Sequence, residues 1–246
     1  MIFGLGGISA STLELLAYAP PGWGATLLAG LVNSVIIALG AYSLGLLIGL
    51  GGAFGKLYGG EILRDILGIY TTIVRAVPEL VLILFLFYAF TGMLNALLLN
   101  WGYDRVVISP LLTGIAVLGI VQGAYSTEVL RGAILAVPAG QLEAARAMGM
   151  PRVTLARRIT LPLMASNAIP GLANLWLNAT KDTALLAVIG FSELTQATKQ
   201  AASTTKAFFT FFLAAMVLYL CVTLISTFLI GKIERWARRG QRDMRG

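Results

Sequence analysis

Ionisable side chains inside apolar stretches are the residues of this sequence that could do chemistry. Glu79, Glu128, Lys181 and Asp182 lie in or beside long apolar runs. A charge at the centre of a membrane span costs roughly 2.5–3.5 kcal/mol on insertion scales, and such residues usually face a cavity, a partner or another charge. Three of the four are carboxylates, so they could offer oxygen ligands to a cationic molecule.

Each of these charges also has a purely structural interpretation. Glu128 and Arg131 are three residues apart, the spacing of an ion pair on one helix, and such a pair would suit a membrane boundary. Lys181 and Asp182 are neighbours, and neighbours on a helix point in different directions, so they cannot simply neutralise each other. One of the two is therefore expected to face a partner or a cavity, and structural support of the preceding span is the alternative.

A stripe of amides forms the second polar feature. Asn167, Asn174 and Asn178 are separated by seven and four residues, so a helix would place them on one face, together with Gly171. In lipid such a face must point at protein or water, and a glycine on it would allow a neighbouring helix to approach closely. We expect this stripe to lie at a subunit interface or along a translocation pathway.

The composition indicates a membrane protein and excludes several kinds of catalysis. Of the 246 residues, 58% are hydrophobic and 12% are charged, against about 25% charged in soluble domains, and the mean hydropathy is +0.85. The sequence has no histidine and a single cysteine, Cys221, so imidazole–metal sites and disulfides are excluded. No GxxxxGK[ST], HExxH, CxxC or GxSxG motif occurs, so we expect a chain that is not an enzyme and holds no metal or nucleotide.

Apolar runs predict an all-α membrane protein with five transmembrane helices. The first covers about 25–51, the second follows the charged turn 56–65 and ends near 93, the third covers about 110–129, the fourth begins near 159, and the last covers about 208–230. Pro78 should kink or break the second. Residues 1–24 are expected to form an outer segment that is not a cleaved signal peptide, residues 25–231 the transmembrane domain, and residues 232–246 a basic tail.

The distribution of lysine and arginine predicts the orientation. The segments 56–75, 131–158 and 232–246 carry 14 of the 18 basic residues, whereas the alternate loops carry only Arg105, Lys199 and Lys206. Because cytoplasmic loops carry an excess of basic residues, we expect the N-terminus outside and the C-terminus in the cytoplasm. The net charge of +7 therefore indicates membrane topology and does not indicate nucleic-acid binding.

The segment 141–162 is the most polar and basic stretch between the predicted spans. Leu142, Ala145 and Met148 recur at three-residue spacing and predict a short helix with one apolar face. Gly149 can take the left-handed conformation that ends a helix, and Pro151 prevents the helix from resuming. The loop 132–158 could merely connect two spans, or it could present a rigid helix to a soluble partner.

The spacing of residues within this segment resembles a family signature. Glu143-Ala144-Ala145, Gly149, and then Ile159, Leu161 and Pro162 match the EAA motif of binding-protein-dependent ABC importer permeases. The stretches 75–80, 122–132 and Lys181-Asp182-Thr183 are similar to segments of the polar amino-acid branch (histidine, arginine and opine importers, Q-type subunit), with Ala76 where glycine is usual. The resemblance implies a MetI-like (type I ABC importer) permease fold, with a coupling helix that sits in a cleft of a cytoplasmic ATPase.

The resemblance also implies the partners. Two copies of the ATPase would bind ATP and magnesium, a homologous M-type permease would complete the membrane unit, and a periplasmic binding protein would deliver the substrate. The chain would lie in the bacterial inner membrane and carry a polar, basic amino acid or an opine, of the histidine, lysine, arginine, ornithine or octopine kind. The asparagine stripe would then line the pathway between two permease subunits.

This function has three alternatives. A secondary transporter or channel would need its own coupling sites and would leave the EAA segment unexplained. A permease of the same class for glutamine, an anionic amino acid or methionine remains open. An intramembrane enzyme lacks a recognisable catalytic set.

Overall fold

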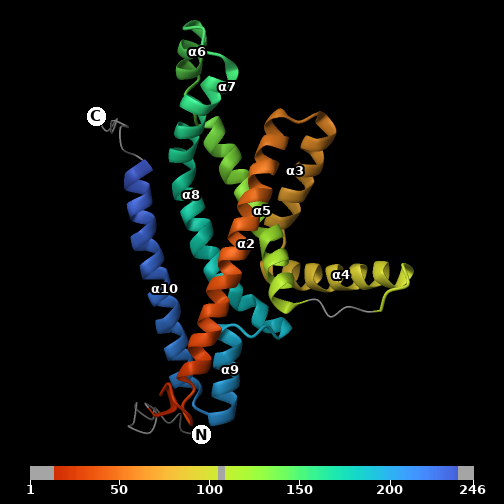
Figure 1. The fold of residues 1–246 in the computed structure, drawn as a ribbon, viewed down its shortest axis with the longest axis vertical. Coiled ribbons are helices and arrows are strands. Elements are labelled where there is room, and N and C mark those ends of the chain that lie inside the picture. The colour runs from red at the N-terminus through yellow and green to blue at the C-terminus, as the bar shows by residue number, and fades with distance from the viewer. Residues whose placement is uncertain (1–13, 105–108, 238–246) are drawn as a thin grey trace.

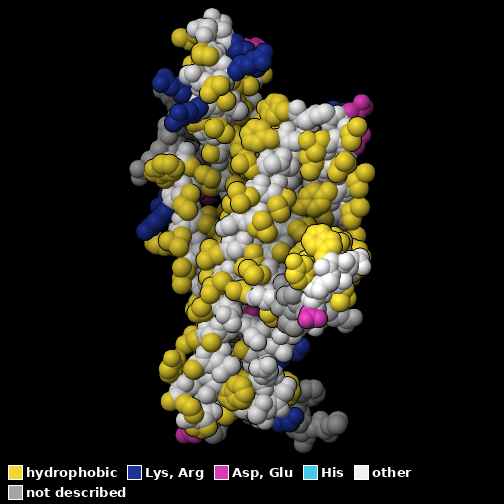
Figure 2. Space-filling view, turned by 45° about the vertical axis from the view of Figure 1, so that its right-hand side comes forward, with side chains coloured by type: hydrophobic (Ala, Val, Ile, Leu, Met, Phe, Trp, Pro, Cys, Tyr) yellow, Lys and Arg dark blue, Asp and Glu magenta, His cyan; other side chains and the backbone are white. Residues whose placement is uncertain are grey.

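A computed structural model describes residues 14–104 and 109–237, and every regular element within these ranges is helical. Four long helices, α2 (Gly24–Tyr58), α5 (Pro110–Leu135), α8 (Leu161–Asp182) and α10 (Phe208–Ala237), extend along the length of the molecule (Figure 1). Hydrophobic side chains cover much of the visible surface, and lysine and arginine gather at one end (Figure 2). This end also carries the short helices α6 (Ala139–Ala147) and α7 (Arg152–Leu155). The all-α class is thus observed throughout the described residues.

Among the described residues, four helices are long and apolar enough to cross a membrane: α2, α4 (Glu79–Asn100), α5 and α10. The helix α8 has 22 residues, which at 1.5 Å per residue span about 33 Å, the thickness of a bilayer core. This helix is less apolar than the other four because its asparagines, its prolines and its terminal Lys181-Asp182 pair lower its hydropathy.

The second apolar region is divided, as the proline within it predicted. The helix α3 (Glu61–Ala76) ends at Val77, which is extended (φ −93°, ψ 140°), because a residue before proline is pushed out of the helical region. Pro78 then caps α4. The two helices do not continue in one direction: α3 runs beside α2, whereas α4 projects sideways from the long helices, at a steep angle to them (Figure 1).

The centre of the fold is the pairing of α2 with α5, and glycines make it close. A Cβ atom at Gly49 would lie 2.4 Å from Ser126 Cβ, and one at Gly45 would lie 2.7 Å from Gln122 Cβ. These glycines therefore allow the two backbones to approach more closely than any side chain would permit. Gly45 and Gly49 thus set the distance between α2 and α5.

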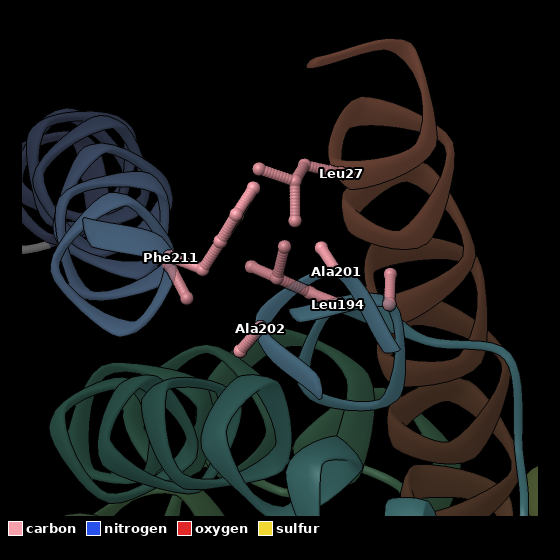
Figure 3. Packing of buried hydrophobic residues seen from close by; sticks show 7 residues of the cluster. Leu27, Leu194, Ala201, Ala202 and Phe211 are labelled. Carbon is pink, nitrogen blue, oxygen red and sulfur yellow. The ribbon is translucent and has the colours of Figure 1, made fainter. Parts of the chain in front are cut away.

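At the end opposite α6 and α7, a short helix fills the space between α2 and α10. The chain leaves α8 through a 3-10 helix, η2 (Thr183–Ile189), turns at Gly190 (φ +82°), and enters α9 (Leu194–Thr205). Leu27, Leu194 and Phe211, from α2, α9 and α10, point toward one another in a buried apolar cluster (Figure 3). This cluster fixes the start of α2 against the start of α10.

Candidate coupling loop and transport pathway

The basic loop forms a short capped helix between two long ones. The helix α6 ends at Met148, and Gly149 follows with φ +73°. The amide of Gly149 donates to the Arg146 carbonyl and the amide of Met150 donates to the Ala145 carbonyl. This pair of hydrogen bonds is the pattern of a Schellman cap. The predicted left-handed glycine at the end of this helix is confirmed.

The predicted apolar face of α6 is covered at Leu142 and Ala145 but not at Met148. Ala145 is 4% exposed, and Leu142 packs on the cluster formed by Ala133, Val137 and Met164. Met148, predicted on the same apolar face, is 85% exposed. The prediction of a buried face was wrong for Met148: its amide still donates the helical hydrogen bond to the Ala144 carbonyl, but no other described part of the chain covers its side chain.

The residues of the EAA motif thus divide between an inner and an outer set. Glu143, Ala144 and Gly149 lie on the exposed side of the loop, and Leu161 and Pro162 are exposed in the first turn of α8. Ile159 is half-buried in a π-helical turn, η1 (Ala156–Thr160), that joins α7 to α8. The spanning helix α5 continues to Leu135, beyond the expected start of this loop at residue 132. Between the loop and the ends of α2, α5 and α8 lies a cavity of about 990 Å³.

Glu128 is the centre of an ion cluster that joins three helices. Its Oε1 lies 2.6 Å from Lys56 Nζ of α2, and its Oε2 lies 2.8 Å from Arg131 Nη2. Lys56 also donates to Thr71 Oγ1 of α3 at 2.5 Å. The predicted pairing of Glu128 with Arg131 is therefore present, but Lys56 had not been recognised as a second partner. The cluster ties α2, α3 and α5 together in the structure.

Asp182 and Glu79 come together although α4 and α8 are distant in sequence. Gln122 Nε2 donates to Asp182 Oδ2 at 3.1 Å, and Glu79 lies close enough to Asp182 and Tyr125 to interact with both electrostatically. Gln122 is 2% exposed, and its Oε1 has no partner within the described residues. Two carboxyl groups and an amide oxygen thus lie near the break between α3 and α4.

The neighbours of Asp182 point elsewhere. Lys181 is exposed, whereas Thr183 is buried and donates to the Thr180 carbonyl at 2.9 Å. The expectation that adjacent charges on a helix diverge is confirmed. Within residues 14–104 and 109–237, no three Asp, Glu or Cys side chains come together in a way that could hold a metal ion.

The asparagine stripe lies beside the contact of α8 with α5. Asn167 and Asn174 are exposed and Asn178 is half-buried, and Asn167 Nδ2 lies 3.4 Å from the Ala133 carbonyl. A Cβ atom at Gly171 would lie 2.7 Å from Val129 Cγ1. The expected close approach of a neighbouring helix at Gly171 is thus observed, and the neighbour is α5 of the same chain.

A buried carboxylate that the sequence analysis missed lies between α2, α9 and α10. Glu193 is 0% exposed and caps α9, accepting bonds from the amides of Thr195 and Gln196 at 2.8 Å each. The Tyr219 hydroxyl donates to its Oε2 at 3.0 Å, and the Ser34 hydroxyl lies 3.3 Å from the same oxygen. The available signal was an acidic residue directly before a short helix in an apolar region, a position that favours carboxylates.

Comparison with known proteins identifies the family. The model of the family described as "Binding-protein-dependent transport system inner membrane component" matches residues 45–239. The nopaline transport system permease of Agrobacterium fabrum is 38% identical, over 94% of this chain and 99% of its own. The histidine/lysine/arginine/ornithine transport system permease of Salmonella typhimurium is also 38% identical, over 87% of this chain and 94% of its own.

Solved structures agree with this assignment. A crystal structure described as an amino acid ABC transporter with histidines superposes with a TM-score of 0.74 at 28% identity, covering 87% of this chain and 94% of its own. An inward-facing methionine ABC transporter has a TM-score of 0.71 at 19% identity, over 89% of this chain and 99% of its own, and supports the fold alone. With four helices apolar enough to span a membrane, this multi-pass membrane protein belongs to the family of binding-protein-dependent transport system inner membrane components.

Proposed function

We propose that this chain is the permease subunit of an ATP-driven importer for polar, basic amino acids or opines. The observation that carries the proposal is the capped helix α6, held by Ala145 while Glu143, Ala144 and Gly149 remain exposed. A helix that is fixed on one side and bare on the other is suited to transmit the movement of a soluble subunit to the spans. Hydrolysis of ATP, with its magnesium, would be carried out by that separate subunit.

The topology follows from adding α8 to the four apolar helices. Five spans would then be α2, the α3–α4 region, α5, α8 and α10, with the N-terminus outside and the C-terminus in the cytoplasm of a bacterial inner membrane. In support, α6 and α7 lie at the same end of the molecule as the end of α10, and α9 lies at the opposite end (Figure 1). The polar face of α8 would be tolerated in the membrane because it borders α5 and faces a second subunit.

A complete importer would comprise this chain, a homologous M-type permease, two copies of the ATPase and a periplasmic binding protein. The exposed amides Asn167 and Asn174 would line the pathway between the two permeases. Binding of the ATPase must favour one orientation of the pathway over the other, since a partner shifts a conformational equilibrium only by its differential affinity.

The substrate class is supported by the relatives and by one local feature. The relatives named above carry nopaline or histidine, lysine, arginine and ornithine according to their descriptions. Here, the Glu79 and Asp182 carboxyl groups, with the unpartnered amide oxygen of Gln122, would accept hydrogen bonds from an ammonium or guanidinium group. An arginine side chain with five N–H donors suits such a set of acceptors.

The experiment is co-purification followed by reconstitution. The chain would be isolated from its native membrane, the co-purifying subunits identified by mass spectrometry, and uptake of labelled arginine, histidine and octopine measured in liposomes with and without ATP. Recovery of an ATPase and a second permease, with ATP-dependent uptake of one of these substrates, is expected. Uptake driven by a proton gradient without ATP would contradict the proposal, and uptake of glutamine alone would contradict the substrate class.

A further inference from the structure

A groove between α2, α3 and α5 combines basic side chains with aliphatic ones. It has a volume of about 800 Å³ and is lined by Lys56, Arg64, Asp65, Ile69, Ile73 and Arg131, among others. The candidate pathway residues Glu79, Gln122 and Asp182 are not part of this lining.

The polar half of the groove has donors to spare and a net positive charge. Lys56 uses two of its three N–H donors on Thr71 and Glu128, and Arg131 uses its Nε and Nη2 groups on Glu128. Three cations and the two carboxylates Asp65 and Glu128 leave a net charge of +1. Because Glu128 holds two of the cations in place, the remaining donors are fixed before any anion binds.

The apolar half continues along one face of α3. Ile62, Ile66, Ile69 and Ile73 follow one another at spacings of four, three and four residues, which places them on one stripe. They are 78%, 58%, 61% and 52% exposed. Such an exposed apolar stripe can contact a hydrocarbon chain, and two of its members, Ile69 and Ile73, line the groove beside the basic side chains.

We propose that this groove binds an acidic phospholipid. The phosphate of the headgroup lies against Lys56, Arg64 and Arg131, and an acyl chain follows the isoleucine stripe of α3. Basic pockets between membrane helices bind anionic headgroups in this way. The net charge of +1 matches the single negative charge of phosphatidylglycerol, whereas phosphatidylcholine carries a cation of its own that would meet Arg64. The bound lipid thereby joins α3 to the Lys56–Glu128–Arg131 cluster.

The test is lipid retention by the purified importer, with all the subunits that co-purify with this chain. The complex would be stripped of lipid in detergent, titrated with phosphatidylglycerol or phosphatidylcholine of identical acyl chains, and examined by native mass spectrometry. We expect preferential retention of phosphatidylglycerol. The variant Arg64→Gln should weaken this retention about fivefold, which corresponds to about 1 kcal/mol. Arg64 is chosen because Lys56 and Arg131 also bind Glu128.

The matched control is Lys232→Gln, which removes a basic residue from α10, outside the groove; it should leave retention unchanged. Equal retention of the two lipids, or no effect of Arg64→Gln, would overturn the proposal. Complete displacement of phosphatidylglycerol by millimolar inorganic phosphate would also overturn it, because the site would then be a free phosphate site. If Ile66→Ser separates the two permease subunits and leaves lipid retention unchanged, the stripe is a subunit interface and the proposal fails.

Discussion

Replacing Gly49 by alanine should disrupt the central helix pair, whereas replacing Gly51 two residues later should not. At Gly49 the added Cβ would lie 2.4 Å from Ser126 Cβ and 2.9 Å from the Ser126 carbonyl carbon. At Gly51 an added Cβ would have no neighbour within 4 Å. Both residues lie within α2, so they share the same helical backbone and differ only in what they face.

The magnitude follows from these distances. Carbon atoms prefer separations of about 3.5–4.0 Å, so α2 and α5 would have to move apart by roughly 1 Å at Gly49. Overpacking of this kind typically costs about 1–3 kcal/mol, and loosening the Gly45 contact one turn away adds to it. The substitution Gly51→Ala should instead stabilise α2 by about 0.5–1 kcal/mol, because alanine loses less conformational entropy in a helix than glycine does.

The measurement is thermal unfolding of the purified chain in one detergent, followed by far-ultraviolet circular dichroism. Gly49→Ala is expected to unfold at a lower temperature than the natural chain and Gly51→Ala at the same or a slightly higher temperature. Equal unfolding temperatures for the two variants would refute the close pairing of α2 and α5 at Gly49, and with it the arrangement that brings Lys56 to Glu128.

Three further predictions concern the sites. The substitution Glu193→Ala removes the cap of α9 and the acceptor of the Tyr219 hydroxyl, so it should lower the free energy of unfolding by about 2–3 kcal/mol in the same unfolding assay. The control Thr204→Ala removes a hydroxyl that is bonded only to its own helix, and it should change the free energy of unfolding little. The substitution Gly149→Asp should be tolerated by the fold, because an added Cβ would meet no neighbouring atom and the left-handed φ of +73° costs a larger residue only roughly 1 kcal/mol. The chain should therefore insert normally in a membrane-fractionation assay but retain less ATPase on co-purification. Full retention of the ATPase would argue against coupling through this loop. Asp182→Asn removes one of two adjacent carboxylates and should lower uptake of a basic amino acid roughly tenfold, the equivalent of one charge-assisted hydrogen bond, with the ATPase still bound; unchanged uptake in liposomes would exclude a substrate contact there.

Local features of the chain could be predicted from the sequence because they depend on neighbouring residues. Gly149 and Pro151 restrict backbone angles wherever they occur, so the capped end of α6 followed from the residues themselves. Pro78 divided the second apolar region for the same reason. The failure at Met148 has a different cause: helical spacing gives the face on which a side chain lies, but whether that face is covered depends on the elements packed beside it.

Contacts between distant residues could not be predicted in this way. Lys56 meets Glu128 across 72 positions, and Ser34 meets Glu193 across 159. Hydropathy indicates that such residues are costly in a membrane but does not indicate their partners. Partner choice depends on how α2 and α5 face each other, and that rotation is fixed by glycines whose neighbours lie on another helix.

The sequence by itself therefore determined the all-α class, the long apolar helices and the loop carrying the family signature, but not the short helix α9, since periodicity, hydropathy and turn residues act over a few positions. The tertiary structure alone decided the direction of α4, the joining of Glu79 to Asp182, the ion cluster around Glu128 and the burial of Glu193. The physical reason is that a buried charge is stabilised only by groups brought to it by packing, and packing depends on the whole chain.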